Sequence, residues 1–185
     1  NIPVSGFTYA QLRQFDFGLY RGYPFKGERI PLLEDFFKIC ARTGMHPMLS
    51  VHPSLSGHWG NIKAMAKKYG VLHQLNIKSD PYSIEVPMAV LLDDIESYTI
   101  DTSVAESFVS RFDSLSETYG IVNAKKTIEY NYTVITDALI TATLNGGYRC
   151  GCFNYGNDLS AVEALIEKGV TEFTEDYNSS VGLNW

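Results

Sequence analysis

The chain contains 185 residues, 45% of them hydrophobic and 13% aromatic, and carries a formal net charge of −6. This length and composition predict one globular domain spanning residues 1–185. The excess of acidic residues argues against a nucleic-acid-binding surface, because phosphate contacts need clustered Lys and Arg. No apolar run approaches the roughly 20 residues that cross a bilayer, so we expect no transmembrane segment.

Helix-like and strand-like patterns alternate along the chain, after an irregular, aromatic-rich start with one short helix expected at 8–14. Leu33, Phe36, Phe37 and Cys40 have the i, i+3, i+4, i+7 spacing of one helix face, and Gly44 is placed to end that helix. The remaining expected elements are, in chain order, a strand at 45–51, a helix at 61–69, a strand at 71–77, a helix at 81–92 interrupted by Pro87, a strand at 96–101, a helix at 104–119, a strand at 126–130, a helix at 134–144, a strand at 148–153, a helix capped by Asp158 with the stripe Leu159, Val162, Leu165 and Ile166, and a strand at 170–174.

The three cysteines do not predict a disulfide framework. Cys40 lies on the apolar side of its expected helix and is interpreted as a small core residue. Cys150 and Cys152 are two apart in a strand-like run, so they point to the same face, and such neighbours rarely pair with each other.

Six expected strands, each but the last followed by a helix, indicate a parallel sheet with crossover helices. The sheet could be an open doubly wound sheet or a (β/α)8 barrel. No G-x-G-x-x-G follows an early strand, which disfavours a doubly wound dinucleotide binder. A complete barrel has eight strands and at least about 200 residues, so a barrel of this length would lack about two βα units at its front.

Two stretches carry a family resemblance. Residues 7–33 read FTYAQLRQFDFGLYRGYPFKGERIPLL, and residues 169–178 read GVTEFTEDYN. They resemble the linker L-T-x-A-E-L-x-x-x-D-x-G…F-x-G-E-x-I-P-T-L-E-E and the closing strand G-V-D-G-I-x-T-D-x-P of the glycerophosphodiester phosphodiesterase family. The resemblance implies an α/β fold, an incomplete (β/α)8 TIM-type barrel of about six βα units whose first two strands are missing. An unrelated open α/β sheet is the alternative.

For an intact relative, the resemblance implies hydrolysis of glycerophosphodiesters to an alcohol and glycerol phosphate, with a divalent cation (Mg²⁺ or Ca²⁺) and a histidine pair. The family's H-R-G, E-x-D and H-D motifs lie upstream of the linker, so no catalytic residue is assignable in this chain. Its E-x-K motif is replaced here, with Ser50 at the position of the metal-binding Glu and His52 at that of the Lys. We therefore expect the chain alone to be inactive and to hold no metal. The alternative is a non-catalytic binding or structural module, such as a degenerate barrel in a surface or phage tail protein.

Active-site groups of such barrels lie at the carboxyl ends of strands. By that rule, the predicted substrate-binding residues are His52, Lys78 and Glu129, which would suit a phosphoryl group beside a hydroxyl-rich alcohol. Phe153, in place of the family's tryptophan, is expected as a substrate wall. The alternative is that these polar residues are simply solvated. The other strand-end candidates are Ser50, Asn76, Glu96 with Asp101, Asn131, Asn154, and Glu175 with Asp176.

The loop at 52–59 leaves two alternatives open. His52 and His58 could bind a metal or belong to a flexible polar loop, and Trp59 could be a ligand lid or tuck against a helix. Residues 156–158 could likewise hold a phosphate or cap the following helix, and the negative charge of Asp158 favours the cap.

The expected partner is a phosphodiester, either a small molecule or a polymer. An open barrel would also expose the backbone of two edge strands, which is an aggregation hazard. We therefore expect a companion chain or segment, or an oligomer, to cover the open edge.

Overall fold

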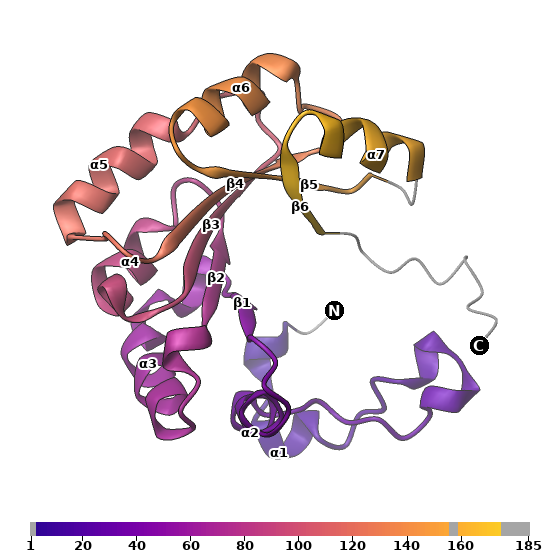
Figure 1. The fold of residues 1–185 in the computed structure, drawn as a ribbon. Helices are drawn as coiled ribbons and strands as arrows, with labels where there is room; N and C mark the ends of the chain where they lie inside the picture. The colour runs from indigo at the N-terminus through magenta and orange to yellow at the C-terminus, as the bar shows by residue number, and fades with distance from the viewer. Residues whose placement is uncertain (1–2, 156–158, 175–185) are drawn as a thin grey trace. The chain divides into compact units, whose positions relative to one another are not determined.

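The computed structural model describes residues 3–155 and 159–174 (Figure 1). The described part of the chain divides into two compact units, one within residues 3–36 and the other within residues 37–174. We call them the N-terminal unit and the barrel unit and describe each by itself. The single domain expected over 1–185 stays a prediction.

The N-terminal unit consists of short helical turns. The one α-helix that lies wholly within it, α1 (Tyr9–Leu12), was predicted from the sequence. A capping box begins it, because the Thr8 hydroxyl accepts from the Gln11 N–H while the Gln11 side chain accepts from the Thr8 N–H at 2.8 Å. The flanking 3-10 turns are η1 (Val4–Gly6), η2 (Leu19–Arg21) and η3 (Tyr23–Phe25).

Six parallel strands form the sheet of the barrel unit. They are β1 (Met48–Ser50), β2 (Asn76–Ser79), β3 (Ser97–Thr102), β4 (Lys125–Asn131), β5 (Arg149–Phe153) and β6 (Val170–Thr174). Each strand pairs with the next one along the chain, in the order β1-β2-β3-β4-β5-β6. A doubly wound sheet reverses its strand order at a switch point, whereas a barrel does not. This unbroken order and the curvature of the sheet in Figure 1 confirm the predicted incomplete barrel.

Helices precede and connect the strands, and those between strands cover one face of the sheet. They are α2 (Leu33–Thr43), α3 (Trp59–Lys68), α4 (Glu85–Leu91), α5 (Val109–Tyr119), α6 (Asp137–Asn145) and α7 (Leu159–Glu167), with 3-10 turns η4 (Pro53–His58), η5 (Leu72–Gln74) and η6 (Leu92–Asp94). Figure 1 shows α3 to α7 on the convex side of the sheet. Within the described part of the chain, no helix has the length and apolar character needed to cross a membrane.

The core lies between these helices and the outer face of the sheet. Ile100, Ile128 and Cys150 on that face are fully buried. Tyr130 reaches the helix layer, where its hydroxyl lies 3.1 Å from the Thr143 hydroxyl of α6. Cys40, Cys150 and Cys152 are all buried, and Cys40 was predicted as a small core residue. Because side chains alternate along a strand, the neighbours of these residues point to the opposite face, which we call the inner face.

Some element boundaries differ from the sequence-based expectation. The second strand starts at Asn76 rather than near 71, because Leu72–Gln74 form the 3-10 turn η5. Pro87 does not interrupt its helix, since it is the third residue of α4, where a backbone N–H has no acceptor within the helix. Helix α5 begins at Val109, and Val104, expected on its buried face, is 49% exposed outside it.

The expected apolar stripe of α7 is also partly wrong. Leu159 and Ile166 are 74% and 55% exposed, and the buried residues of α7 are Ala161 and Leu165. The small side chain of Ala161 allows close packing, which a stripe drawn from large residues does not predict. The expected cap, Asp158, lies outside the described residues.

Candidate functional site

Polar side chains line the inner face of the sheet. Thr99, Thr127 and Glu129 are 2%, 0% and 2% exposed, and Lys78 is 9% exposed. The interior of a (β/α)8 barrel is usually filled by branched apolar side chains, and burying charge requires a partner. This polar inner face is therefore the first candidate for a functional site.

A buried ion pair joins β2 to β4 across β3. The Lys78 ammonium contacts the Glu129 carboxylate through Oε2. The other carboxylate oxygen, Oε1, is buried and has no hydrogen-bond partner among the described residues. Glu129 is thus held in place through one oxygen and keeps a second one available as an acceptor.

Asp101 adds a second carboxylate to this group. It lies on β3 in register with Glu129 of β4, so the two side chains are neighbours on the inner face. Burial raises the pKa of the Asp101 carboxyl, and the negative charge of Glu129 acts in the same direction, while Lys78 opposes both. Asp101 thus lies beside the Lys78–Glu129 ion pair, and the charges of both partners act on its carboxyl group.

Phe153 completes the cluster from β5. The Lys78 Nζ lies 5.2 Å from the centroid of its ring, within the range of a cation–π interaction. Three of the four predicted substrate-binding residues, Lys78, Glu129 and Phe153, therefore come together on the inner face. We call these three with Asp101 the Lys78 cluster.

Gly151 makes room for the cluster, and sequence reasoning missed it. It lies on β5 in register with Glu129, and an added Cβ would be 2.9 Å from the Glu129 Cγ. A glycine inside a strand often marks the close approach of another group, and that signal was present in the sequence.

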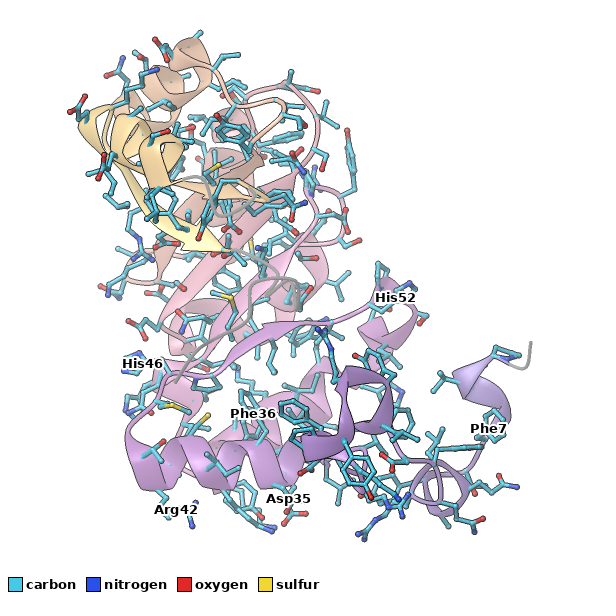
Figure 2. The ribbon with its side chains drawn as sticks, turned by 90° about the vertical axis from the view of Figure 1, so that its right-hand side faces the viewer. Phe7, Asp35, Phe36, Arg42, His46 and His52 are labelled. Carbon is cyan, nitrogen blue, oxygen red and sulfur yellow. The ribbon has the colours of Figure 1, made fainter. Side chains whose placement is uncertain are left out.

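The fourth predicted residue, His52, makes local contacts. Its Nδ1 accepts from the Ser54 N–H at 3.3 Å and lies 2.9 Å from the Ser54 hydroxyl, so His52 caps η4. Figure 2 shows His52 and His46 beyond opposite ends of β1. The role of His52 in substrate binding stays a prediction. Trp59 is 3% exposed at the start of α3, which supports the packed alternative over the lid.

Two strand-end candidates are corrected. Asn76 is the first residue of β2, and Glu96 precedes β3, so both lie at the amino ends of their strands. Glu96 contacts His46, and the Lys125 ammonium lies 3.1 Å from its carboxylate. Asn76 was misplaced because β2 begins several residues after its expected start. Glu96 was the first residue of its expected strand, so that expectation already put it at the amino end.

Other candidates either make local turns or lie outside the described residues. The Asn131 side chain accepts from the Thr133 N–H at 2.9 Å and from the Thr133 hydroxyl at 2.8 Å, which forms a turn after β4. Asn154 follows β5 with a φ of 58°. Residues 156–158, Glu175 and Asp176 are not among the described residues.

A divalent cation does not fit the described side chains. Ser50, at the end of β1, offers a hydroxyl where the resemblance calls for a carboxylate, and a hydroxyl is a poor ligand for Mg²⁺ or Ca²⁺. Among residues 3–155 and 159–174, no group of three His, Cys, Asp or Glu side chains is arranged to hold a metal ion. No chemical step is therefore derived through a metal on these residues.

The fold is similar to solved phosphodiesterase structures. A phosphodiesterase of Oleispira antarctica, in complex with the product sn-glycerol-3-phosphate, aligns over 96% of this chain and 70% of its own, with a TM-score of 0.75 and 18% identity. The chain has the fold of the glycerophosphodiester phosphodiesterases. The enzyme from Parabacteroides distasonis aligns over 91% of this chain and 66% of its own (TM-score 0.67, 18% identity), and that from Agrobacterium tumefaciens over 95% and 71% (TM-score 0.66, 15% identity).

The chain spans about two thirds of the length of these three structures. No family model and no curated protein sequence matches it. In (β/α)8 barrels the active site lies at the carboxyl ends of the strands. Lys78, Glu129 and Phe153 lie in the carboxyl halves of β2, β4 and β5, so the cluster occupies the end of the sheet where that site is expected.

Proposed function

We propose that this chain is the C-terminal portion of a barrel of the glycerophosphodiester phosphodiesterase family. In the complete barrel, the protein hydrolyses a glycerophosphodiester to an alcohol and glycerol phosphate. The observation that carries the proposal is a fold shared over 96% of the chain with a phosphodiesterase in complex with sn-glycerol-3-phosphate. The sequence pattern at residues 28–34 supports it independently.

The Lys78 cluster would bind the phosphodiester. An ammonium carries three N–H donors, and its contact with Glu129 occupies one direction, which leaves donors for a phosphoryl oxygen. Glu129 fixes the position of Nζ, and Phe153 forms a wall beside it. His52, two residues after β1, is proposed as a further substrate contact.

The groups that break the P–O bond would come from outside these residues. The described side chains offer no group of three His, Cys, Asp or Glu residues arranged to hold a metal ion. In an intact relative, a divalent cation supplies Lewis-acid chemistry, and the motifs that hold it lie upstream of the linker. We propose that the 185-residue chain alone is inactive and that a companion segment pairs with the edge strands β1 and β6, which have one strand neighbour each among the described strands.

The test compares the 185-residue chain with the protein extended by its upstream coding sequence. Release of glycerol 3-phosphate from sn-glycero-3-phosphocholine is measured with glycerol-3-phosphate dehydrogenase. We expect activity only in the extended protein. Lys78→Met should lower its kcat/KM about 100-fold, as expected for the loss of one donor to a developing charge. Lys125→Met, which removes an exposed lysine at the amino end of β4, is the matched control and should have little effect.

A folded, extended protein that releases no alcohol from several glycerophosphodiesters would refute the proposed hydrolysis. If that protein still binds them, the non-catalytic binding module becomes the better account. Activity in the 185-residue chain alone would refute the proposal that its catalytic groups lie elsewhere.

A further inference from the structure

The N-terminal unit exposes a group of large apolar side chains on one short loop. We call residues Leu19–Lys26 the aromatic loop. Within it, Leu19, Tyr20, Tyr23 and Phe25 are 51%, 77%, 78% and 54% exposed. Single exposed apolar residues are ordinary, but four within one loop are typical of an interaction surface for a protein or a membrane.

Hydrogen bonds hold this loop in a fixed shape. The Asp16 carboxylate accepts from the N–H groups of Gly18 and Leu19, both at 3.0 Å, and from the Gly27 N–H at 2.8 Å. One side chain therefore ties the start of the loop to its end. Gly18 allows the close return of the chain, since an added Cβ would lie 1.7 Å from the Phe25 carbonyl oxygen. The exposure of the aromatic rings thus belongs to an ordered loop.

The charge on the loop is opposite to that of the protein. Residues 17–27 contain Arg21 and Lys26 and no acidic residue, in a chain with a net charge of −6. The Arg21 guanidinium lies 5.2 Å from the Tyr20 ring centroid, and the Lys26 ammonium lies 5.2 Å from that of Tyr23. Each exposed tyrosine therefore has a cation beside it. Tyrosine rings settle at the headgroup level of a bilayer, and nearby basic side chains attract anionic headgroups.

We propose that the aromatic loop binds the surface of an anionic lipid bilayer. Leu19 and Phe25 enter the boundary between headgroups and acyl chains, the two tyrosines lie at the headgroups, and Arg21 and Lys26 contact lipid phosphates. Exposed tyrosine rings with a cation beside each, and no acidic residue among residues 17–27, match the headgroup region of an anionic bilayer. The inference does not depend on the proposed hydrolysis.

The test is co-sedimentation of the extended protein with vesicles. Vesicles of phosphatidylcholine alone are compared with vesicles that also contain phosphatidylglycerol. We expect binding to the anionic vesicles, and weakening of this binding by added salt. The double variant Arg21→Gln/Lys26→Gln should bind about 25-fold more weakly, because each basic side chain near an anionic surface contributes about fivefold. Tyr20→Ser/Tyr23→Ser should also lower binding.

Two matched controls lie in the barrel unit. Tyr82→Ser removes a tyrosine that is 69% exposed, and Lys67→Gln removes an exposed lysine, and neither should change vesicle binding. Circular dichroism checks that every variant is folded. Absence of binding to anionic vesicles, or binding that the loop variants leave unchanged, would overturn the proposal. A dimer that the loop variants dissociate, without vesicle binding, would assign the loop to a second copy instead.

Discussion

The buried pair of Lys78 and Glu129 allows a sharp prediction about stability. Lys78→Met removes the ammonium and leaves the Glu129 carboxylate, 2% exposed, beside the Asp101 carboxyl. Removing one partner of a buried pair lowers the free energy of unfolding by about 3–5 kcal/mol. For a chain of this size, each kcal/mol shifts Tm by about 2–4 °C, so we expect a decrease of about 6–20 °C at pH 7.

The double variant Lys78→Met/Glu129→Gln separates this cause from a loss of packing. It removes both charges, so the uncompensated carboxylate disappears. We expect the double variant to be more stable than Lys78→Met alone, with a coupling of about 1–3 kcal/mol between the two sites. Glu129→Gln alone should lower the free energy of unfolding less than Lys78→Met does. The amide keeps an oxygen that can accept a hydrogen bond from Lys78, and the Asp101 carboxyl group remains near the ammonium.

Urea unfolding, followed by the fluorescence of the buried Trp59, measures these differences. A cost below about 1 kcal/mol at pH 7, or costs that simply add in the double variant, would refute this account of the pair.

Three further predictions concern single positions. Gly151→Ala should lower the free energy of unfolding by about 1–3 kcal/mol, because the new Cβ would lie 2.9 Å from the Glu129 Cγ. An unchanged urea midpoint would contradict this and show that the Glu129 side chain can shift to make room. Asp101→Asn should raise Tm at pH 7 but not at pH 3. The raised pKa of Asp101 means that the folded state disfavours the charged carboxylate, and the substitution removes this penalty only where the carboxylate would be charged. Equal effects at both pH values would contradict this. Thr136→Ala should lower the free energy of unfolding, measured in urea, by about 1 kcal/mol, because the Thr136 hydroxyl caps α6 by accepting from the Leu139 N–H at 3.3 Å. Thr136→Ser keeps a hydroxyl and should lower it far less.

A glycine turn marked the end of the preceding helix but did not by itself fix where the next strand starts. The last strand was expected at 170–174 and was found there, after the turn at Gly169 with a φ of 93°. The second strand was placed too early, because Val71 and Leu75 are both buried but lie on either side of a 3-10 turn. An apolar run shows that a segment is buried without showing which backbone conformation buries it. The same error misplaced Asn76.

The sequence by itself determined that strands and helices alternate, that the sheet is parallel, and that Lys78, Glu129 and Phe153 lie in the carboxyl halves of their strands. These properties follow from hydrophobic periodicity and turn residues, which act over a few neighbouring positions. Only the tertiary structure decided that Lys78 pairs with Glu129, that Asp101 lies in register beside Glu129, and that Gly151 gives them room. Those contacts depend on the register between strands that are distant along the chain, and register is fixed when the whole sheet packs against its helices.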